Sequence, residues 1–242
     1  MENINLENLP KHIAIILDGN RRWAKARGLT TKEGHTEGFD NLERIAKYAD
    51  EIGIKHLTVY AFSTENWKRS QEEVSWLMNI FKTNIDRYLQ RLDNGNIKIR
   101  IIGEKSNVPK ELVPRIEKIM KKTENNQGMV LNIAFNYGGR AELVNATKQI
   151  AQKVKDGTIN LEDITEQMIS DNLYTAGQPD PDLLIRTSHE LRTSNFLPWQ
   201  LTYTEFYFPE KNWPEFTNED LIEAIKVYQG RNRRFGARPD TK

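Results

Sequence analysis

The sequence predicts an α/β fold, a single domain with a mostly parallel central sheet flanked by helices. Short apolar runs without polar alternation alternate along the chain with longer segments that carry apolar residues at helical spacing. The 242 residues suit one such domain with a sizeable core, and we find no internal repeat or long linker. We therefore expect residues 1–242 to form one domain, with a polar N-terminal arm and a basic C-terminal tail.

The first apolar run, Ile13 to Leu17, predicts a strand that is buried on both faces. Asp18 stands where this strand ends, Gly19 relieves the turn, and Asn20 is a candidate cap for a helix. The first turn of that helix carries Arg21, Arg22 and Trp23. A helix N-terminus beside guanidinium groups suits a phosphate, and a divalent cation such as Mg²⁺ would relieve the repulsion between that anion and the carboxylate. A plain Asp-Gly turn after a core strand is the alternative, and this stretch alone leaves both open.

The second strand is predicted over Lys55 to Phe62, after a helix from Thr36 to Gly53 with one apolar face. A polar connection over 29–34 precedes that helix and leads to His35, a possible hydrogen-bond donor to phosphate. Residues 63–69 follow the second strand with the same kinds of polar and aromatic side chains as the first cluster. Two such clusters at strand ends predict one shared crevice.

The next predicted helix, Gln71 to Leu92, carries apolar residues on two faces. Core packing, an apolar ligand and a subunit interface all remain open for the second face. Further strands are predicted over 97–102, 129–135 and 183–185, and further helices over 109–122, 141–155 and 218–230. The pair Gly138-Gly139 could either bring backbone N–H groups near an anion or let a helix pack closely on the sheet.

The fifth strand ends at Arg186, and Arg192 follows six residues later with hydroxyl side chains between and beyond the two. Glu205 lies in an aromatic-rich stretch, where a carboxylate needs a cation or an arginine as its partner. Together the strand ends supply diphosphate-binding groups but no nucleophile–base pair and no zinc set. A bound pyrophosphate group with Mg²⁺ fits these side chains.

Composition excludes several other classes of function. The formal charge of +1 gives no overall field that favours nucleic acid or an acidic membrane, so we expect no nucleic-acid partner. The absence of cysteine excludes disulfides, thiolate metal sites and a cysteine nucleophile. Neither G-x-G-x-x-G nor the P-loop pattern occurs, which removes support for dinucleotide or P-loop nucleotide binding. No signal-peptide pattern and no apolar run of about 20 residues are present.

Seven segments resemble motifs of the cis-prenyltransferase family, in the same order: HIAIILDGNRRWA, GHTEG, AFSTENWKRS, LNIAFNYGGRAE, DLLIRTSHELRTSNFLPWQ, TEFYF and the closing RRFG. The resemblance extends from about His12 to Gly236 and is closest to the bacterial undecaprenyl diphosphate synthases. It implies an apolar tunnel between sheet and helices, and a transferase that condenses isopentenyl diphosphate with an allylic diphosphate, typically farnesyl diphosphate. The implied product is a long-chain cis-polyprenyl diphosphate such as undecaprenyl diphosphate, used in cell wall biogenesis, and the implied cofactor is Mg²⁺.

The family resemblance also implies a cytoplasmic homodimer. Because the implied product is a lipid, we also expect peripheral contact with the membrane. A synthase of short- or medium-chain products is an alternative, as is a non-catalytic prenyltransferase subunit. The retained polar side chains at the strand ends argue against the non-catalytic subunit.

The resemblance implies catalytic roles for Asp18, which acts with Mg²⁺, and for Asn66, at the position usually assigned to proton removal. An amide is a poor base, so we expect Asn66 to orient substrate while the proton leaves through the released diphosphate. Asp18 and Glu205 match metal-linked positions. Substrate-binding positions are implied for Gly19, Asn20, Arg21, Arg22, Trp23, His35, Ser63, Thr64, Glu65, Trp67, Arg69, Arg186, Arg192, Thr193 and Ser194.

Two departures from the family pattern affect the predicted phosphate sites. Thr31 stands where bacterial members usually place a phosphate-binding arginine, and Lys32 is a partial substitute. His189 stands where glycine is usual, which raises the question of the backbone shape in the isopentenyl diphosphate loop.

Overall fold

The computed structural model describes residues 4–91, 96–106 and 108–233, and these form two compact units. The first unit contains the chain up to Lys55, the segment Asp180–Leu191 and the chain from Gln200. The second contains His56–Pro179 and Arg192–Trp199. The single domain over 1–242 stays a prediction. The end of the predicted basic tail and of the RRFG segment lies outside the described residues.

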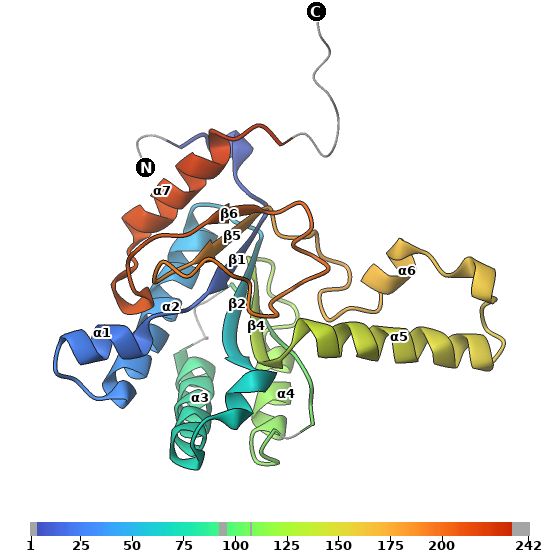
Figure 1. The fold of residues 1–242 in the computed structure, drawn as a ribbon, viewed down its shortest axis with the longest axis horizontal. Helices are drawn as coiled ribbons and strands as arrows, with labels where there is room; N and C mark the ends of the chain where they lie inside the picture. The colour runs from blue at the N-terminus through green and yellow to red at the C-terminus, as the bar shows by residue number, and fades with distance from the viewer. Residues whose placement is uncertain (1–3, 92–95, 107, 234–242) are drawn as a thin grey trace, which may run out of the picture. The chain divides into compact units, whose positions relative to one another are not determined.

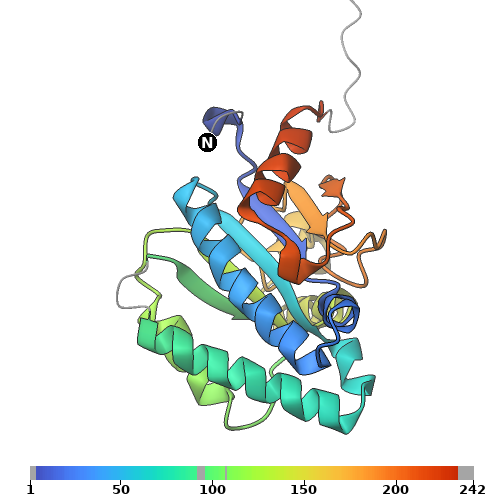
Figure 2. The same ribbon diagram turned by 90° about the vertical axis from the view of Figure 1, so that its left-hand side faces the viewer.

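The first unit is built on three parallel strands in the order β1-β5-β6 (Figure 1). They are β1 (His12–Ile16), β5 (Leu183–Arg186) and β6 (Glu205–Tyr207). All five residues of β1 are buried, as expected from the unbroken apolar run. The helices are α1 (Asn20–Ala26), α2 (Thr31–Glu51) and α7 (Asn218–Gln229); α1 packs on α2, and α7 packs on β5 and β6 (Figure 2).

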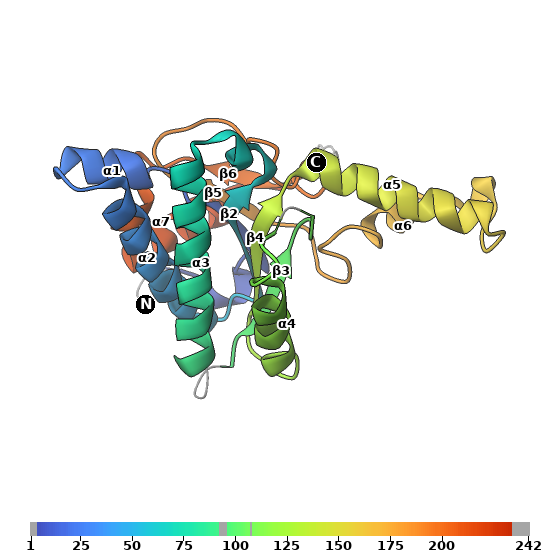
Figure 3. The ribbon, with the colours of Figure 1, turned by 90° about the horizontal axis from the view of Figure 1, so that it is seen from below.

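The second unit is built on three parallel strands in the order β3-β4-β2. They are β2 (His56–Ser63), β3 (Lys98–Ile102) and β4 (Val130–Tyr137). The helices are α3 (Gln71–Arg91), α4 (Val113–Lys122), α5 (Gly139–Lys155) and α6 (Glu166–Ser170). Helices α3 and α4 lie side by side, while α5 projects away from the strands with α6 beside it (Figure 3). The Phe81 ring of α3 stacks on Phe135 of β4 with centroids 3.8 Å apart.

The predicted α/β class with parallel strands flanked by helices is therefore confirmed, since the strands within each unit pair in parallel and helices flank them. The predicted start of one helix was wrong. Helix α2 begins at Thr31, because Thr30 and Glu33 form a reciprocal capping box within the stretch that we expected to be a polar connection. Strand β6 and helix α6 were not predicted. None of the helices within the described ranges is long and apolar enough to cross a membrane.

Candidate active site

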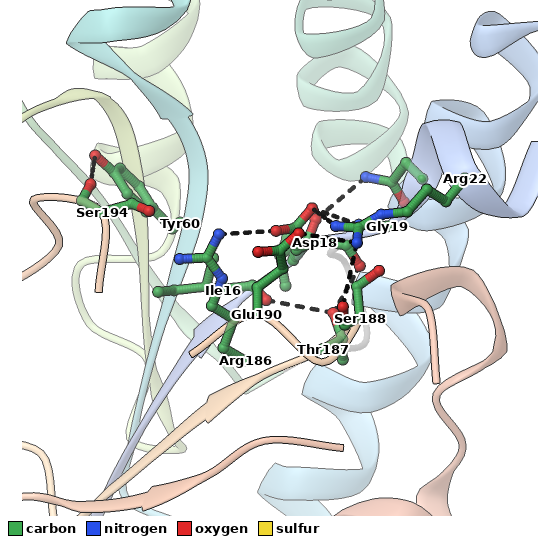
Figure 4. A network of polar contacts seen from close by, with 12 residues as sticks. Ile16, Asp18, Gly19, Arg22, Tyr60, Arg186, Thr187, Ser188, Glu190 and Ser194 are labelled. Carbon is green, nitrogen blue, oxygen red and sulfur yellow. Dashed lines mark hydrogen bonds and ion pairs between the residues drawn. The ribbon is translucent and has the colours of Figure 1, made fainter. Parts of the chain in front are cut away.

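The carboxylate of Asp18 lies just beyond the end of β1, between two arginines of the first unit (Figure 4). Its Oδ2 accepts a hydrogen bond of 2.8 Å from Arg186, and its Oδ1 is 3.2 Å from the Arg22 guanidinium. Oδ1 also accepts from the backbone N–H of Gly19 at 2.7 Å. The Arg186 side chain is only 4% exposed, whereas that of Asp18 is 28% exposed. The site thus combines a fixed buried cation with a carboxylate that remains open to solvent.

The turn after Asp18 requires glycine. Gly19 is the N-cap of α1 and has a φ of +103°, in the left-handed region. A Cβ atom at this position would lie 2.7 Å from the Ser188 Oγ and would also clash with Asn212. The expected capping role of Asn20 was wrong: Asn20 is the first helical residue, and its side-chain amide donates to the carbonyl of Leu17 at 3.3 Å.

We expect Gly19→Ala to destabilise the protein by about 1–3 kcal/mol, because it adds backbone strain and a steric clash. Urea unfolding followed by circular dichroism measures the change. Gly28→Ala is the matched control, since Gly28 also has a positive φ, +67°, but nothing lies within 4 Å of the added Cβ. Equal losses of stability in the two variants would contradict the close packing around Gly19.

The loop after β5 is held against the Asp18 turn by backbone and hydroxyl contacts. The Thr187 Oγ1 donates to the Asp18 carbonyl at 2.7 Å, and the Ser188 N–H donates to the Lys211 carbonyl at 2.7 Å. Glu190, which we did not predict as a site residue, lies 2.9 Å from the Arg22 guanidinium. Arg22 therefore contacts both carboxylates, and it also donates to the Ser188 carbonyl (Figure 4).

His189 is exposed and has a φ of +53°, so the loop adopts the left-handed conformation that glycine favours. The loop thus keeps a glycine-like backbone conformation although a histidine stands at the position where glycine is usual. We expect His189→Gly to raise the free energy of unfolding by less than about 1 kcal/mol and to leave turnover unchanged. Thermal unfolding and steady-state kinetics measure the two effects, and a large loss of turnover in the glycine variant would assign the imidazole a direct role.

The other predicted positions of the first unit differ in their surroundings. Arg27 stacks over the Trp23 ring at 4.6 Å, and the same guanidinium lies 3.0 Å from Glu215. His35 lies in the early part of α2 and is half-buried. Arg21 is exposed on α1. The substrate-binding roles of Trp23, His35 and Arg21 remain predictions.

In the second unit, residues 64–68 form a 3-10 turn directly after β2. The backbone N–H of Ser63 donates to the Asn66 Oδ1 at 3.0 Å, and the Ser63 side chain accepts from the backbone N–H of Asn66. The side-chain carbonyl of Asn66 thus accepts one hydrogen bond from the protein, and its amide group offers two donors to further partners. This geometry suits a residue that orients substrate better than one that removes a proton.

Two neighbours of Asn66 are fixed by hydrogen bonds to asparagines. The Trp67 Nε1 donates to the Asn136 Oδ1 at 2.7 Å, and the Asn195 Nδ2 donates to the Glu65 Oε1 at 2.8 Å. Burial raises the pKa of Glu65, but hydrogen bonds from Asn195, from its own backbone and from Ser63 and Thr64 leave the pKa below its usual value. Glu65 is therefore an anion at neutral pH.

The remaining predicted groups of the second unit are solvent-accessible. Arg69 pairs with Glu73 at 2.9 Å, and Arg192 and Ser194 are exposed.

The glycine pair at the start of α5 serves close packing, because a Cβ on Gly139 would clash with Pro198. This contact favours close packing over an anion site, the two interpretations of the glycine pair that the sequence left open.

A cavity of about 520 Å³ is lined by β3, α4 and the connection between them. Its walls include the apolar side chains of Ile99, Ile101, Ile116 and Phe135. None of the predicted substrate-binding residues lines it. The cavity therefore offers apolar space in the second unit without locating the predicted tunnel.

Comparison with known proteins identifies the family. The family model described as "Putative undecaprenyl diphosphate synthase" matches residues 16–236. The chain belongs to the cis-prenyltransferase family. The isoprenyl transferase of Staphylococcus saprophyticus is 49% identical to this prenyltransferase over 233 residues, which cover 96% of this chain and 92% of the relative. That of Bacillus subtilis is 48% identical over 235 residues, covering 97% and 90% respectively.

Solved structures show the same fold. Lavandulyl diphosphate synthase from Lavandula x intermedia, in complex with dimethylallyl diphosphate, matches this prenyltransferase with a TM-score of 0.92 and 41% identity. A probable undecaprenyl diphosphate synthase from Campylobacter jejuni matches with a TM-score of 0.78 and 30% identity. Each match covers 95% of this chain and 99% of the other.

Asp18 and Glu205 of the prenyltransferase do not lie close together within one chain. Glu205 pairs in register with Leu183, which in turn pairs with Ile13 at the beginning of β1, whereas Asp18 follows the end of that strand. The Glu205 Oε2 accepts a hydrogen bond of 2.7 Å from Arg231. An arginine is thus the partner of this carboxylate, one of the two possibilities that the sequence left open.

The residues around Asp18 fit one Mg²⁺ ion that is bound together with a diphosphate. Across the described part of the chain, no group of three or more His, Asp or Glu side chains could hold a metal. Mg²⁺ is commonly held by one or two carboxylates, substrate phosphates and water, so a dedicated cage is unnecessary. A carboxylate has about four acceptor positions. In Asp18, Arg186 uses one position at Oδ2, and Arg22 and the Gly19 N–H use two at Oδ1.

Proposed function

We propose that this prenyltransferase extends an allylic diphosphate, with farnesyl diphosphate as the starter, by successive cis additions of isopentenyl diphosphate and releases a long polyprenyl diphosphate. The observation that supports this best is the placement of Asp18 between Arg22 and Arg186 at the end of β1. Guanidinium groups bind diphosphate oxygens in fixed geometry, while the partly exposed carboxylate faces the same anion. Such a set requires a cation between carboxylate and phosphate, which we propose is Mg²⁺.

In this proposal the chemistry begins with ionisation of the allylic substrate. Arg22 and Arg186 hold the diphosphate and stabilise the negative charge that grows on it as the C–O bond breaks. When bound, Mg²⁺ held by Asp18 adds electrophilic support to the leaving group. No basic side chain is needed, because the released diphosphate itself can accept the proton that the new product loses.

The isopentenyl diphosphate is assigned to the second unit. Arg192, Thr193 and Ser194 supply the charged and hydroxyl donors for its phosphates. Asn66 would donate from its amide N–H groups to the substrate, while its carbonyl accepts from the Ser63 N–H and fixes the side chain. We assign Gly19 to Trp23 and His35 to the allylic site, and Ser63, Thr64, Glu65, Trp67 and Arg69 to the condensation site.

Incubation of the purified protein with Mg²⁺, farnesyl diphosphate and labelled isopentenyl diphosphate, followed by sizing of the products, tests this function. We expect long-chain products whose added double bonds are cis. A single short product would favour the alternative of a short-chain synthase, which the similarity to lavandulyl diphosphate synthase keeps open. Absence of any condensation product would contradict the enzymatic proposal.

We also propose that the protein is a cytoplasmic homodimer that touches the membrane peripherally as its lipid product leaves. The second unit leaves large apolar side chains exposed near its projecting helix: Val144 of α5 is 54% exposed and Leu161 is 67% exposed. Burial of such side chains against a second copy would remove apolar surface from water. Light scattering should give twice the mass of one chain, and the mass of a single chain would contradict the dimer.

A further inference from the structure

Asn195 lies at the meeting point of three segments of the second unit. Its backbone carbonyl accepts from the Gly139 N–H at 2.8 Å, and its Oδ1 accepts from the Arg140 N–H at 2.9 Å. These N–H groups belong to the first turn of α5, where the N-cap residue Gly138 provides no side-chain hydrogen bond. Asn195 thus satisfies two N–H groups at the helix start that would otherwise have no partner within the helix.

The engagement of the Oδ1 fixes the orientation of the Asn195 amide. Because that oxygen faces the Arg140 N–H, the Nδ2 group points the other way and donates to the Glu65 Oε1 at 2.8 Å. Glu65 precedes Asn66 in the turn after β2. Asn195 directly follows Ser194, so a single side chain joins the two stretches that the proposed function assigns to the isopentenyl diphosphate.

The backbone around Asn195 is held in a conformation that side chains disfavour. Ser194, Asn195 and Leu197 have φ values of +50°, +66° and +47°. Such residues persist only where surrounding contacts fix them, and they are concentrated at functional sites. Here the Tyr60 ring stacks on Phe196 with centroids 4.5 Å apart. The Tyr60 hydroxyl lies between two carbonyl acceptors, that of Tyr137 at 3.2 Å and that of Ser194 at 3.4 Å (Figure 4).

We propose that Asn195 is a positioning residue that sets the segment Arg192–Ser194 against the turn that carries Asn66, acting through Glu65. The inference rests on the proposed function and assigns a role to a side chain that does not itself touch the substrate. A displacement of one of these stretches relative to the other should affect the reacting geometry more than substrate affinity, so the loss should fall mainly in kcat.

Asn195→Asp isolates the contact with Glu65. Aspartate keeps an oxygen for the Arg140 N–H and tolerates a positive φ, but it places a carboxylate oxygen against the carboxylate of Glu65. We expect kcat to fall at least tenfold, with smaller changes in the KM for either substrate and a nearly unchanged midpoint of thermal unfolding. Asn125→Asp adds the same charge at an exposed position of the second unit and should leave kcat unchanged.

A second substitution, Glu65→Gln, distinguishes a positioning role of Asn195 from a general defect in the variant protein. In Glu65→Gln the side-chain amide can donate to an aspartate at 195, so Asn195→Asp should reduce kcat less than threefold in that background. Equal losses in both backgrounds, or no loss in the wild-type background, would overturn the inference. A wild-type protein that forms no product would overturn the proposed function and this inference with it, whereas an active wild type with an insensitive Asn195→Asp variant would overturn the inference alone.

Discussion

Replacement of Asp18 by asparagine should reduce prenyl transfer by about a thousandfold or more, at any Mg²⁺ concentration, while the protein still folds. Asparagine keeps an oxygen for the Gly19 N–H, so the turn after β1 retains this hydrogen bond, whereas its amide group replaces the oxygen that accepts from Arg186. It removes the negative charge that binds the cation, and the leaving diphosphate then loses its electrophilic support.

The measurement for this variant is single-turnover formation of the first condensation product over a range of Mg²⁺ concentrations. Asp40→Asn removes a carboxylate from the exposed surface of α2 in the same unit and serves as the control. Full recovery of activity at high Mg²⁺ would reduce Asp18 to a contributor to metal affinity. Activity near that of the wild type at ordinary Mg²⁺ would contradict the mechanism.

Arg192→Ala should chiefly weaken the binding of isopentenyl diphosphate. A hydrogen bond to a charged group contributes about 1.5–3 kcal/mol, so the KM for this substrate should rise by roughly 10- to 150-fold, while the KM for the allylic substrate changes little. Arg192→Lys should recover only part of the loss, because an ammonium group keeps the charge but not the two-pronged geometry.

Steady-state kinetics with each substrate varied in turn measure this effect. Lys148→Ala is the control, since it removes an exposed cation from α5 in the same unit. An equal rise in the KM for both substrates in Arg192→Ala would mean that the arginine does not discriminate between the two sites. An unchanged KM for isopentenyl diphosphate would contradict its assignment.

The strands with unbroken apolar runs were predictable because their burial is encoded locally. Strand β1 differs from its predicted range by one residue at each end, and its five residues are all buried. Strand β6 carries no such signal: its three residues are half-buried, and pairing with β5 makes them a strand. The start of α2 was predictable in principle, because Thr30 and Glu33 have the spacing of a capping box.

Site residues that directly follow the end of a strand were predictable from the sequence. Site residues whose place depends on contacts with distant parts of the chain were not. Asp18 and Arg186 were identified because each ends an apolar run, and the parallel pairing of β1 with β5 explains their ion pair. Asn136 and Asn195 were missed because nothing near them in the sequence indicates their partners, which are 30 or more residues away. The placement of Glu205 away from Asp18 required the register of β5 and β6.

A crystal structure of the protein with Mg²⁺ and a thio analogue of farnesyl diphosphate, in which sulfur replaces the bridging oxygen and prevents reaction, tests whether Asp18, Arg22 and Arg186 form the allylic diphosphate site. We expect the diphosphate to contact Arg22 and Arg186 at the end of β1, with an Asp18 oxygen about 2.1 Å from the ion. A diphosphate bound elsewhere, or an ion held without Asp18, would contradict the claim that this carboxylate and these arginines form the allylic diphosphate site.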